Sequence, residues 1–176
     1  PAYPATEPMD AEQRRLAEDF NAQVATGKIA FESVPCLCGA ERFVLIARYD
    51  RYRIRQDSVI CAKCGLIQSM PRLTESAYRD FYGSDLYRRL YNPQVLRLDA
   101  DGFEAMVRVR SYRFEFVRTA PEGPKIRKVL ELGCGGRTAI GYEPSPGLVS
   151  LGRSFGLDLR QGWIEDIDEG GFDLIV

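Results

Sequence analysis

Apolar residues at helical spacing define the first structured element that the chain predicts. Leu16, Phe20 and Val24 recur at intervals of four, which places them on one face of a helix. Asp10 and Gln13 have the spacing of a capping box, in which each side chain accepts a hydrogen bond from the other residue's backbone N–H. The pattern therefore predicts a docking helix that follows a proline-rich leader and ends before the glycine at position 27.

Two short apolar runs, 43–47 and 58–60, come next, and an arginine-rich polar segment separates them. Their length and their β-branched and aromatic residues are typical of strands, so we interpret them as a small hairpin. Beyond it, Thr74 is placed to cap a short helix. Asn92-Pro93 then begins a longer helical region, in which Asp101-Gly102 is the expected break.

Three further apolar runs, 128–132, 139–143 and 172–176, have the character of buried parallel strands. The first ends in a turn with glycines at positions 133, 135 and 136, where the missing side chains let backbone N–H groups approach a bound molecule. We therefore expect an α/β fold with a partial Rossmann-like sheet and a ligand at the carboxyl ends of its strands.

These elements divide the chain into four expected regions. A leader with its helix is followed by a cysteine-containing hairpin module, then by linking helices that form a cap, and last by the truncated Rossmann-like domain. The regions cover residues 1–33, 34–71, 72–125 and 126–176.

Composition narrows the class of protein. The 176 residues carry a formal net charge of −1 and have ordinary apolar content, which is typical of a globular protein with a core and gives no sign of nucleic-acid binding. No apolar run approaches the ~20 residues that span a bilayer, so we expect no membrane association and a cytoplasmic protein. The chain contains no histidine, so a general base, if one is needed, has to be another residue type, and none is identifiable.

Four of the five cysteines fall into two close pairs, C-x-C and C-x-x-C, each followed directly by a glycine. Thiolates at this spacing on tight turns can converge on one tetrahedral zinc ion. Unrelated buried thiols or two disulfides are the alternatives. Because four cysteines would leave no open coordination position, we expect a structural rather than a catalytic zinc in a zinc-ribbon-like module. The expected ligands are Cys36, Cys38, Cys61 and Cys64.

Four of the five arginines between the two cysteine pairs lie within residues 48–55, where two tyrosines are interleaved with them. Arginine forks bind phosphates and aromatic rings stack on bases or sugars, so the segment is a candidate docking site for an anionic substrate. A solvated hairpin surface, partly balanced by Asp50 and Asp57, is the alternative. The arginines are Arg48, Arg51, Arg53 and Arg55.

The run Lys128 to Gly136 resembles motif I of the class I S-adenosylmethionine (SAM) methyltransferases, whose first strand ends in E-x-G-x-G. Residues 139–145 and 172–176 resemble the second and fourth strands of that family. A dinucleotide-binding motif is the alternative, but Thr138 stands where its third glycine belongs. The resemblance implies that Gly133 and Gly135 approach the methionine part of SAM and that Glu131 orients it. It also implies that Glu143 accepts hydrogen bonds from the ribose hydroxyls and that Trp163 and Ile164 flank adenine.

The order of the elements adds a second resemblance, over residues 34–176, to methyltransferases of sugar and polysaccharide biosynthesis that carry a zinc-binding amino-terminal region. It implies a small-molecule acceptor, for instance a nucleotide-linked sugar, and makes Tyr78, Phe81 and Tyr82 candidate residues of the acceptor pocket. A zinc-ribbon module that binds nucleic acid or protein, with a degenerate Rossmann-like scaffold, is the alternative function.

The chain departs from the methyltransferase pattern in two places. Parallel strands need a crossover of a dozen or more residues, yet only a few residues follow Gly136 before the second strand begins. Either a segment is missing there, which we expect, or the cofactor site is deleted. The sequence also stops at Val176, within the expected fourth strand, so we expect the chain to be part of a larger enzyme and to bind SAM poorly as it stands.

Overall fold

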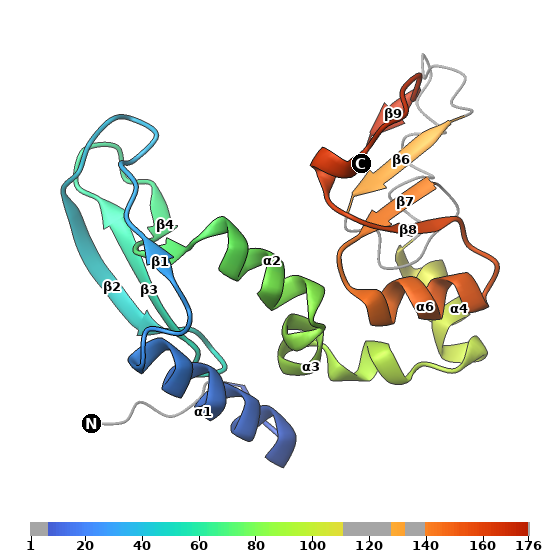
Figure 1. The fold of residues 1–176 in the computed structure, drawn as a ribbon, viewed down its shortest axis with the longest axis horizontal. Helices are drawn as coiled ribbons and strands as arrows, with labels where there is room; N and C mark the ends of the chain where they lie inside the picture. Colours follow the sequence, from blue (N-terminus) through green and yellow to red (C-terminus); the bar gives the residue numbers. More distant parts are fainter. Residues whose placement is uncertain (1–6, 111–127, 133–139, 176) are drawn as a thin grey trace. The chain divides into compact units, whose positions relative to one another are not determined.

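The computed structural model of the protein describes residues 7–110, 128–132 and 140–175 (Figure 1). The chain divides into two compact units, and the division falls between Phe81 and Tyr82. Each unit has its own buried residues and is described separately. No helix among the described residues is both long enough and apolar enough to cross a membrane.

The first unit opens with helix α1, Ala11–Ala25. Its amino terminus has the predicted capping box, because Gln13 N donates to Asp10 Oδ1 at 2.8 Å and Asp10 N donates to Gln13 Oε1 at 2.9 Å. Leu16 and Phe20 are buried on the predicted face. The helix contacts strand β3, so the prediction of a docking helix is confirmed.

Two antiparallel sheets complete the first unit. The hairpin predicted from the two apolar runs is formed by β2 and β3, with Phe43 opposite Cys61, and β4 pairs with the other side of β3. A second, two-stranded sheet joins β1 to β5. The strands are β1 (Phe31–Glu32), β2 (Phe43–Tyr49), β3 (Arg55–Cys61), β4 (Ile67–Ser69) and β5 (Arg72–Leu73).

Short helices follow β5 along the chain, and the first of them, α2, spans the division between the two units. Helix α2 starts where Thr74 caps it, since Ala77 N donates to Thr74 Oγ1 at 3.4 Å. The expected break at Asp101-Gly102 is wrong, because α4 runs through both residues. Asp99 accounts for this: its carboxylate accepts from Gly102 N at 2.9 Å and caps α4, so the break lies just before Ala100. The helices are α2 (Glu75–Gly83), α3 (Leu86–Tyr91), the 3-10 helix η1 (Pro93–Arg97) and α4 (Ala100–Arg110).

The second unit is built on a parallel four-stranded sheet in the order β8-β7-β6-β9 (Figure 1). The chain is therefore mixed α/β with a parallel sheet, as the apolar runs predict. All three predicted strands are present. A further strand, β8, lies between the second and the third of them along the sequence. The elements are β6 (Val129–Leu132), β7 (Ile140–Glu143), α6 (Pro146–Ser154), β8 (Leu159–Gln161), the 3-10 helix η2 (Ile164–Asp166) and β9 (Leu174–Ile175).

Helix α6 makes the crossover from β7 to β8 and supplies much of the core of this unit. Leu148 and Val149 are buried, as is Leu159 on β8. Gly152 permits this packing, because a Cβ there would lie 2.2 Å from Leu159 Cδ1. By contrast, β6 and β7 are paired in parallel although only residues 133–139, which are outside the described ranges, lie between them.

Candidate functional site

The two cysteine pairs lie on two tight turns, one before β2 and one at the end of β3. In the first turn Gly39 N donates to Cys36 O at 2.7 Å, and in the second Gly65 N donates to Cys61 O at 3.0 Å. Both glycines have positive φ angles, 78° and 77°, which side chains disfavour. The glycines after the pairs are thus required by the turn geometry, as the sequence predicts.

The turns bring the four sulfur atoms together. Cys36 Sγ lies 3.5 Å from Cys64 Sγ, and Cys38 Sγ lies 3.7 Å from Cys61 Sγ. All four sulfurs are within 4.8 Å of one another, and none is in a disulfide. Sulfurs bound tetrahedrally to zinc at about 2.3 Å lie about 3.8 Å apart, so the cluster has the dimensions of a zinc site. The four cysteines can therefore hold a metal ion.

Two thiols of the cluster have pKa values shifted in opposite directions, that of Cys61 downward and that of Cys36 upward. The backbone N–H groups of Cys64 and Lys63 donate to the Cys61 sulfur and lower the pKa of Cys61 to about 6. The Cys38 amide lowers the pKa of Cys36, but burial and the neighbouring thiols raise it more, to about 12. Metal binding would displace the proton on Cys36, whereas Cys61 already offers a thiolate at neutral pH.

Acid is expected to release the metal. Because protons compete with the metal for thiolates, retention should be full at neutral pH and should fall in acid, below the pH of about 6 at which the metal-free Cys61 thiol takes up a proton, since a bound metal stabilises the thiolate further. Metal content after dialysis at stepped pH values measures this. A content that stays constant well below that pH would contradict the prediction.

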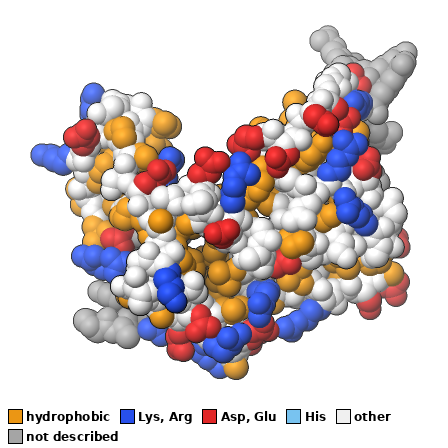
Figure 2. Space-filling model, viewed as in Figure 1, with side chains coloured by type: hydrophobic (Ala, Val, Ile, Leu, Met, Phe, Trp, Pro, Cys, Tyr) orange, Lys and Arg blue, Asp and Glu red, His pale blue; other side chains and the backbone are white. Residues whose placement is uncertain are grey.

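The arginine-rich segment is partly neutralised in the structure. Arg55 Nε lies 2.9 Å from Asp57 Oδ1, and Arg48 Nη1 lies 3.6 Å from Asp57 Oδ2. Asp50 instead orders the hairpin turn by accepting from the backbone N–H groups of Tyr52 and Ile54. On the face drawn in Figure 2, basic and acidic side chains are interspersed. The arrangement agrees with the solvated-hairpin interpretation more closely than with a phosphate-binding patch.

Glu143, at the carboxyl end of β7, is the most enclosed charged residue of the described part of the second unit, with 1% of its side chain exposed. Its Oε1 accepts from Ser145 N at 3.0 Å and its Oε2 from Arg88 Nη2 at 3.2 Å. The Nε atom of Arg88 is buried and has no hydrogen-bond partner within the described ranges. A buried donor without an acceptor beside a buried carboxylate is a place where a ligand oxygen can complete the hydrogen bonding.

Asp85 attaches α3 to the same edge of the sheet. Its backbone has a φ angle of 60°, and its carboxylate accepts from the hydroxyl of Ser145 and, at 3.0 Å, from Gly147 N. Asp85 thereby caps α6 from outside the helix. Gly147 is needed for this approach, since a Cβ there would lie 2.8 Å from Asp85 Oδ2.

Replacing Asp85 is expected to weaken the second unit. Asp85→Ala removes the acceptor for the α6 amino terminus and should cost about 1–2 kcal/mol of unfolding free energy. Asp85→Asn should cost less, because asparagine tolerates a positive φ angle and keeps one acceptor oxygen. Urea denaturation followed by the fluorescence of Trp163, the single tryptophan, measures both. Asp168→Ala, in an exposed loop, is the control, and an equal loss there would contradict the account.

An aromatic cluster lies beside Glu143. Tyr82 stacks on Tyr87 with ring centroids 4.6 Å apart, and Tyr87 stacks on Tyr91 at 4.9 Å. Trp163 meets Tyr82 edge to face at 6.2 Å, and the guanidinium of Arg88 lies 5.2 Å from the Tyr87 ring centroid. The cluster combines the end of helix α2, helix α3 and the loop after β8, and it forms an aromatic wall at the carboxyl edge of the sheet.

The other candidate residues for cofactor and acceptor binding are divided between the two units and the residues outside the described ranges. Glu131 is 8% exposed on β6, next to the strand that bears Glu143, and Ile164 is 60% exposed at the start of η2. Gly133 and Gly135 lie outside the described residues. Of the three predicted acceptor-pocket residues, Tyr82 belongs to the second unit. Tyr78 and Phe81 belong to the first, where Phe81 packs edge to face on Phe20 at 5.6 Å.

Sequence reasoning missed Arg88 and Asp85, although both lie in a predicted helical stretch. The acidic run at residues 165–169, after β8, is not uniformly exposed to solvent. Lys128 and Arg160 both form ion pairs with Glu169 and lower the pKa of its carboxyl group. Glu169 therefore belongs to an ion-pair network and is not a solvated loop residue.

Comparison of the sequence with models of known protein families gives no match, and comparison with curated proteins also gives none. Two features of the described residues indicate possible functional sites. One is the four-cysteine cluster of the first unit, and the other is the buried Glu143–Arg88 pair at the carboxyl edge of the parallel sheet.

Proposed function

We propose that the protein is a SAM-dependent methyltransferase whose cofactor site lies at the carboxyl ends of β6 and β7. The observation that carries the proposal is the buried carboxylate of Glu143 at the end of the second strand of a parallel sheet. Ligands of open α/β sheets bind outside the carboxyl ends of the strands, near the point where the strand order reverses. In the order β8-β7-β6-β9 that point is beside β6.

The residues at this edge suit the parts of SAM. Glu143 uses one acceptor site on each oxygen and keeps capacity for two ribose hydroxyls. Glu131 and the backbone at Gly133 and Gly135 would approach the methionine part. Trp163 and Ile164 would flank adenine, with Trp163 already part of the aromatic wall.

Arg88 gives this site a feature that the family resemblance does not supply. Its guanidinium compensates the buried charge of Glu143 and presents a second, unsatisfied donor, Nε. A bound ribose would accept from this donor while donating to Glu143. Arg88 would thus hold the carboxylate in the orientation that the diol needs.

The methyl group of bound SAM is already activated by its sulfonium, so the residues of the chain have mainly to position the donor and an acceptor. We propose a small-molecule acceptor, a sugar or nucleotide-linked sugar, and a cytoplasmic enzyme. Tyr82, on the aromatic wall, is the best-placed of the three acceptor-pocket candidates. The zinc proposed for Cys36, Cys38, Cys61 and Cys64 would be structural, because four thiolates complete its tetrahedron.

Only residues 133–139 connect β6 to β7, so the 176-residue chain itself is expected to bind SAM more weakly than the product of the uninterrupted gene. The test uses that gene product on immobilised S-adenosylhomocysteine and on heparin. Retention on the first, and methyl transfer from SAM to a panel of nucleotide-linked sugars detected by mass spectrometry, would support the proposal. Retention on heparin alone would favour the zinc-ribbon binding module instead.

A further inference from the structure

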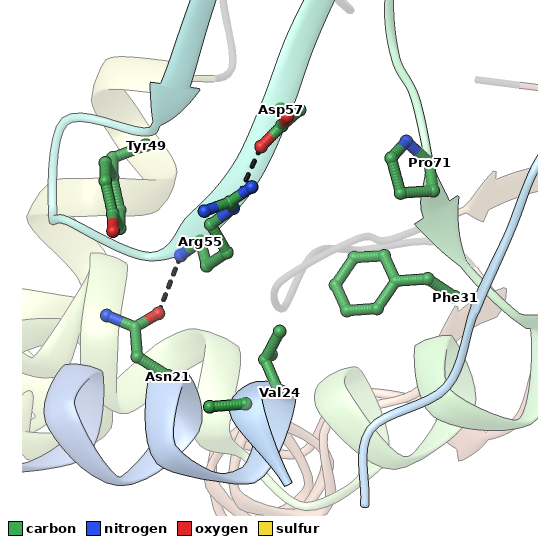
Figure 3. A pocket seen from close by; sticks show the side chains of 8 residues that line it. Asn21, Val24, Phe31, Tyr49, Arg55, Asp57 and Pro71 are labelled. Atoms are coloured by element: carbon green, nitrogen blue, oxygen red, sulfur yellow. Dashed lines mark hydrogen bonds and ion pairs between the residues drawn. The ribbon is translucent and has the colours of Figure 1, made fainter. Parts of the chain in front are cut away.

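The first unit contains a hollow of about 320 Å³ between helix α1 and the β2–β3 hairpin. Figure 3 shows Arg55 and Asp57 on one side, Phe31 and Pro71 on the opposite side, and Val24 of α1 along the base. The volume is at the lower end of the ~300–1,000 Å³ that small-molecule pockets occupy. The lining residues are Asn21, Val24, Ala25, Phe31, Tyr49, Arg55, Asp57 and Pro71.

The guanidinium of Arg55 is held in place by two contacts. Its Nε atom lies 2.9 Å from Asp57 Oδ1, and its Cζ atom lies 5.7 Å from the centroid of the Tyr49 ring. The backbone beneath it is fixed as well, because Arg55 N donates to Asn21 Oδ1 at 2.7 Å (Figure 3). Asn21 also donates to Arg53 O at 2.8 Å, so this amide serves to join α1 to the hairpin turn.

The two terminal nitrogens of Arg55 donate no hydrogen bond to any residue in the ranges that the structure describes, and its ion pair with Asp57 is made through Nε. Asp57 is bound through Nε, so the outer fork, Nη1 and Nη2, stays available. This fork matches two carboxylate oxygens, and its immobilised position lowers the entropy that binding would cost.

Charge and polarity around the hollow select the ligand further. Arg55 of the lining and Arg48, which is outside it, share the single carboxylate of Asp57, so this group of three side chains has an excess of one positive charge. That excess balances a monoanion better than a phosphate dianion. Most of the remaining wall is apolar or aromatic: Val24, Ala25, Phe31, Tyr49 and Pro71.

We propose that this hollow binds a small monocarboxylate with an apolar or aromatic body. The carboxylate would bind the outer fork of Arg55, and the body would occupy the space between Phe31 and the end of α1. The site is made entirely of residues of the first unit, so it is independent of the proposed cofactor site on the parallel sheet.

Phenylacetate is a suitable probe, titrated into the zinc-loaded protein and followed by ligand-observed NMR. We expect saturable binding with a dissociation constant of about 1 mM or lower. Neutral phenylacetamide, which has the same body, should bind at least about tenfold more weakly, because it loses the charge-assisted pair. Inorganic phosphate should not displace phenylacetate. Equal binding of acid and amide, displacement by phosphate, or absence of saturable phenylacetate binding would each overturn the proposal.

Variants locate the site. Arg55→Gln should weaken phenylacetate binding about tenfold or more, since it removes the fork. Val24→Phe should weaken binding by filling the base of the hollow. Arg51→Gln is the matched control, because it removes the same charge from the same hairpin, where Arg51 lies over Tyr52 and does not line the hollow. Zinc content and circular dichroism verify that each variant is folded. Equal effects of the two arginine substitutions in folded protein would contradict the assignment.

Discussion

Replacing Cys61 by serine is expected to release the metal and to unfold the β2–β3–β4 sheet. Cys61 is 2% exposed, ends β3, and has a sulfur that is already a thiolate at neutral pH. In zinc-finger peptides structural zinc contributes an apparent ~10–16 kcal/mol, more than a sheet this small can supply from its own apolar burial. Three thiolates would retain the metal weakly, and the two glycine turns would lose the ion that joins them.

Elemental analysis of the purified variant and limited proteolysis within residues 36–69 measure this effect. The wild-type protein should contain about one zinc per chain. The control is Cys134→Ser, which changes the fifth cysteine of the sequence, a residue that is not one of the four expected ligands. It should retain the full metal content and resist the protease as the wild type does. The four-cysteine account fails if Cys61→Ser keeps stoichiometric metal, or if both serine variants lose it.

Glu143→Gln is expected to reduce SAM affinity about 10- to 100-fold, because hydrogen bonds to a charged acceptor contribute about 1.5–3 kcal/mol. Glutamine keeps the shape of the side chain but offers one acceptor oxygen and no charge. The glutamine side chain would therefore bind the ribose diol less tightly, and Arg88 would lose the carboxylate that orients its guanidinium. Titration calorimetry on the product of the uninterrupted gene measures the change.

Glu169→Gln is the matched control for this substitution. Glu169 is another glutamate paired with cations, with 23% of its side chain exposed, but its partners are Arg160 and Lys128, and Lys128 precedes β6 at the amino ends of the strands. The substitution should leave SAM affinity unchanged. Trp163 fluorescence during urea unfolding shows whether either variant has lost structure. If the two substitutions reduce affinity equally in folded protein, Glu143 does not contact the cofactor.

Local signals account for the parts of the fold that the sequence predicts well. The capping box of Asp10 and Gln13 defines the start of α1 within a few residues, and the glycines after each cysteine pair define the two turns. The apolar runs give strands β6, β7 and β9 because buried parallel strands leave a continuous apolar pattern. Glu143 is a candidate only through the family resemblance, as the acidic residue that ends the second apolar run.

Features that depend on distant contacts could not be predicted in this way. Arg88 and Glu143 are 55 positions apart, and the attachment of Asp85 to α6 spans 62, so no periodicity relates them. The predicted helix break at Asp101-Gly102 was wrong because Asp99 caps α4 and the helix continues through Gly102. The Arg55 hollow likewise requires α1 to pack on β3, which only the three-dimensional structure reveals.

The most direct test of the central claim is calorimetric titration of SAM into the product of the uninterrupted gene, with the zinc content checked beforehand. The account predicts saturable binding of one SAM per chain with a dissociation constant in the micromolar range, weakened by Glu143→Gln and not by Glu169→Gln. A folded, zinc-loaded protein that gives no saturable heat with SAM would contradict the assignment of this parallel sheet as a methyl-donor site.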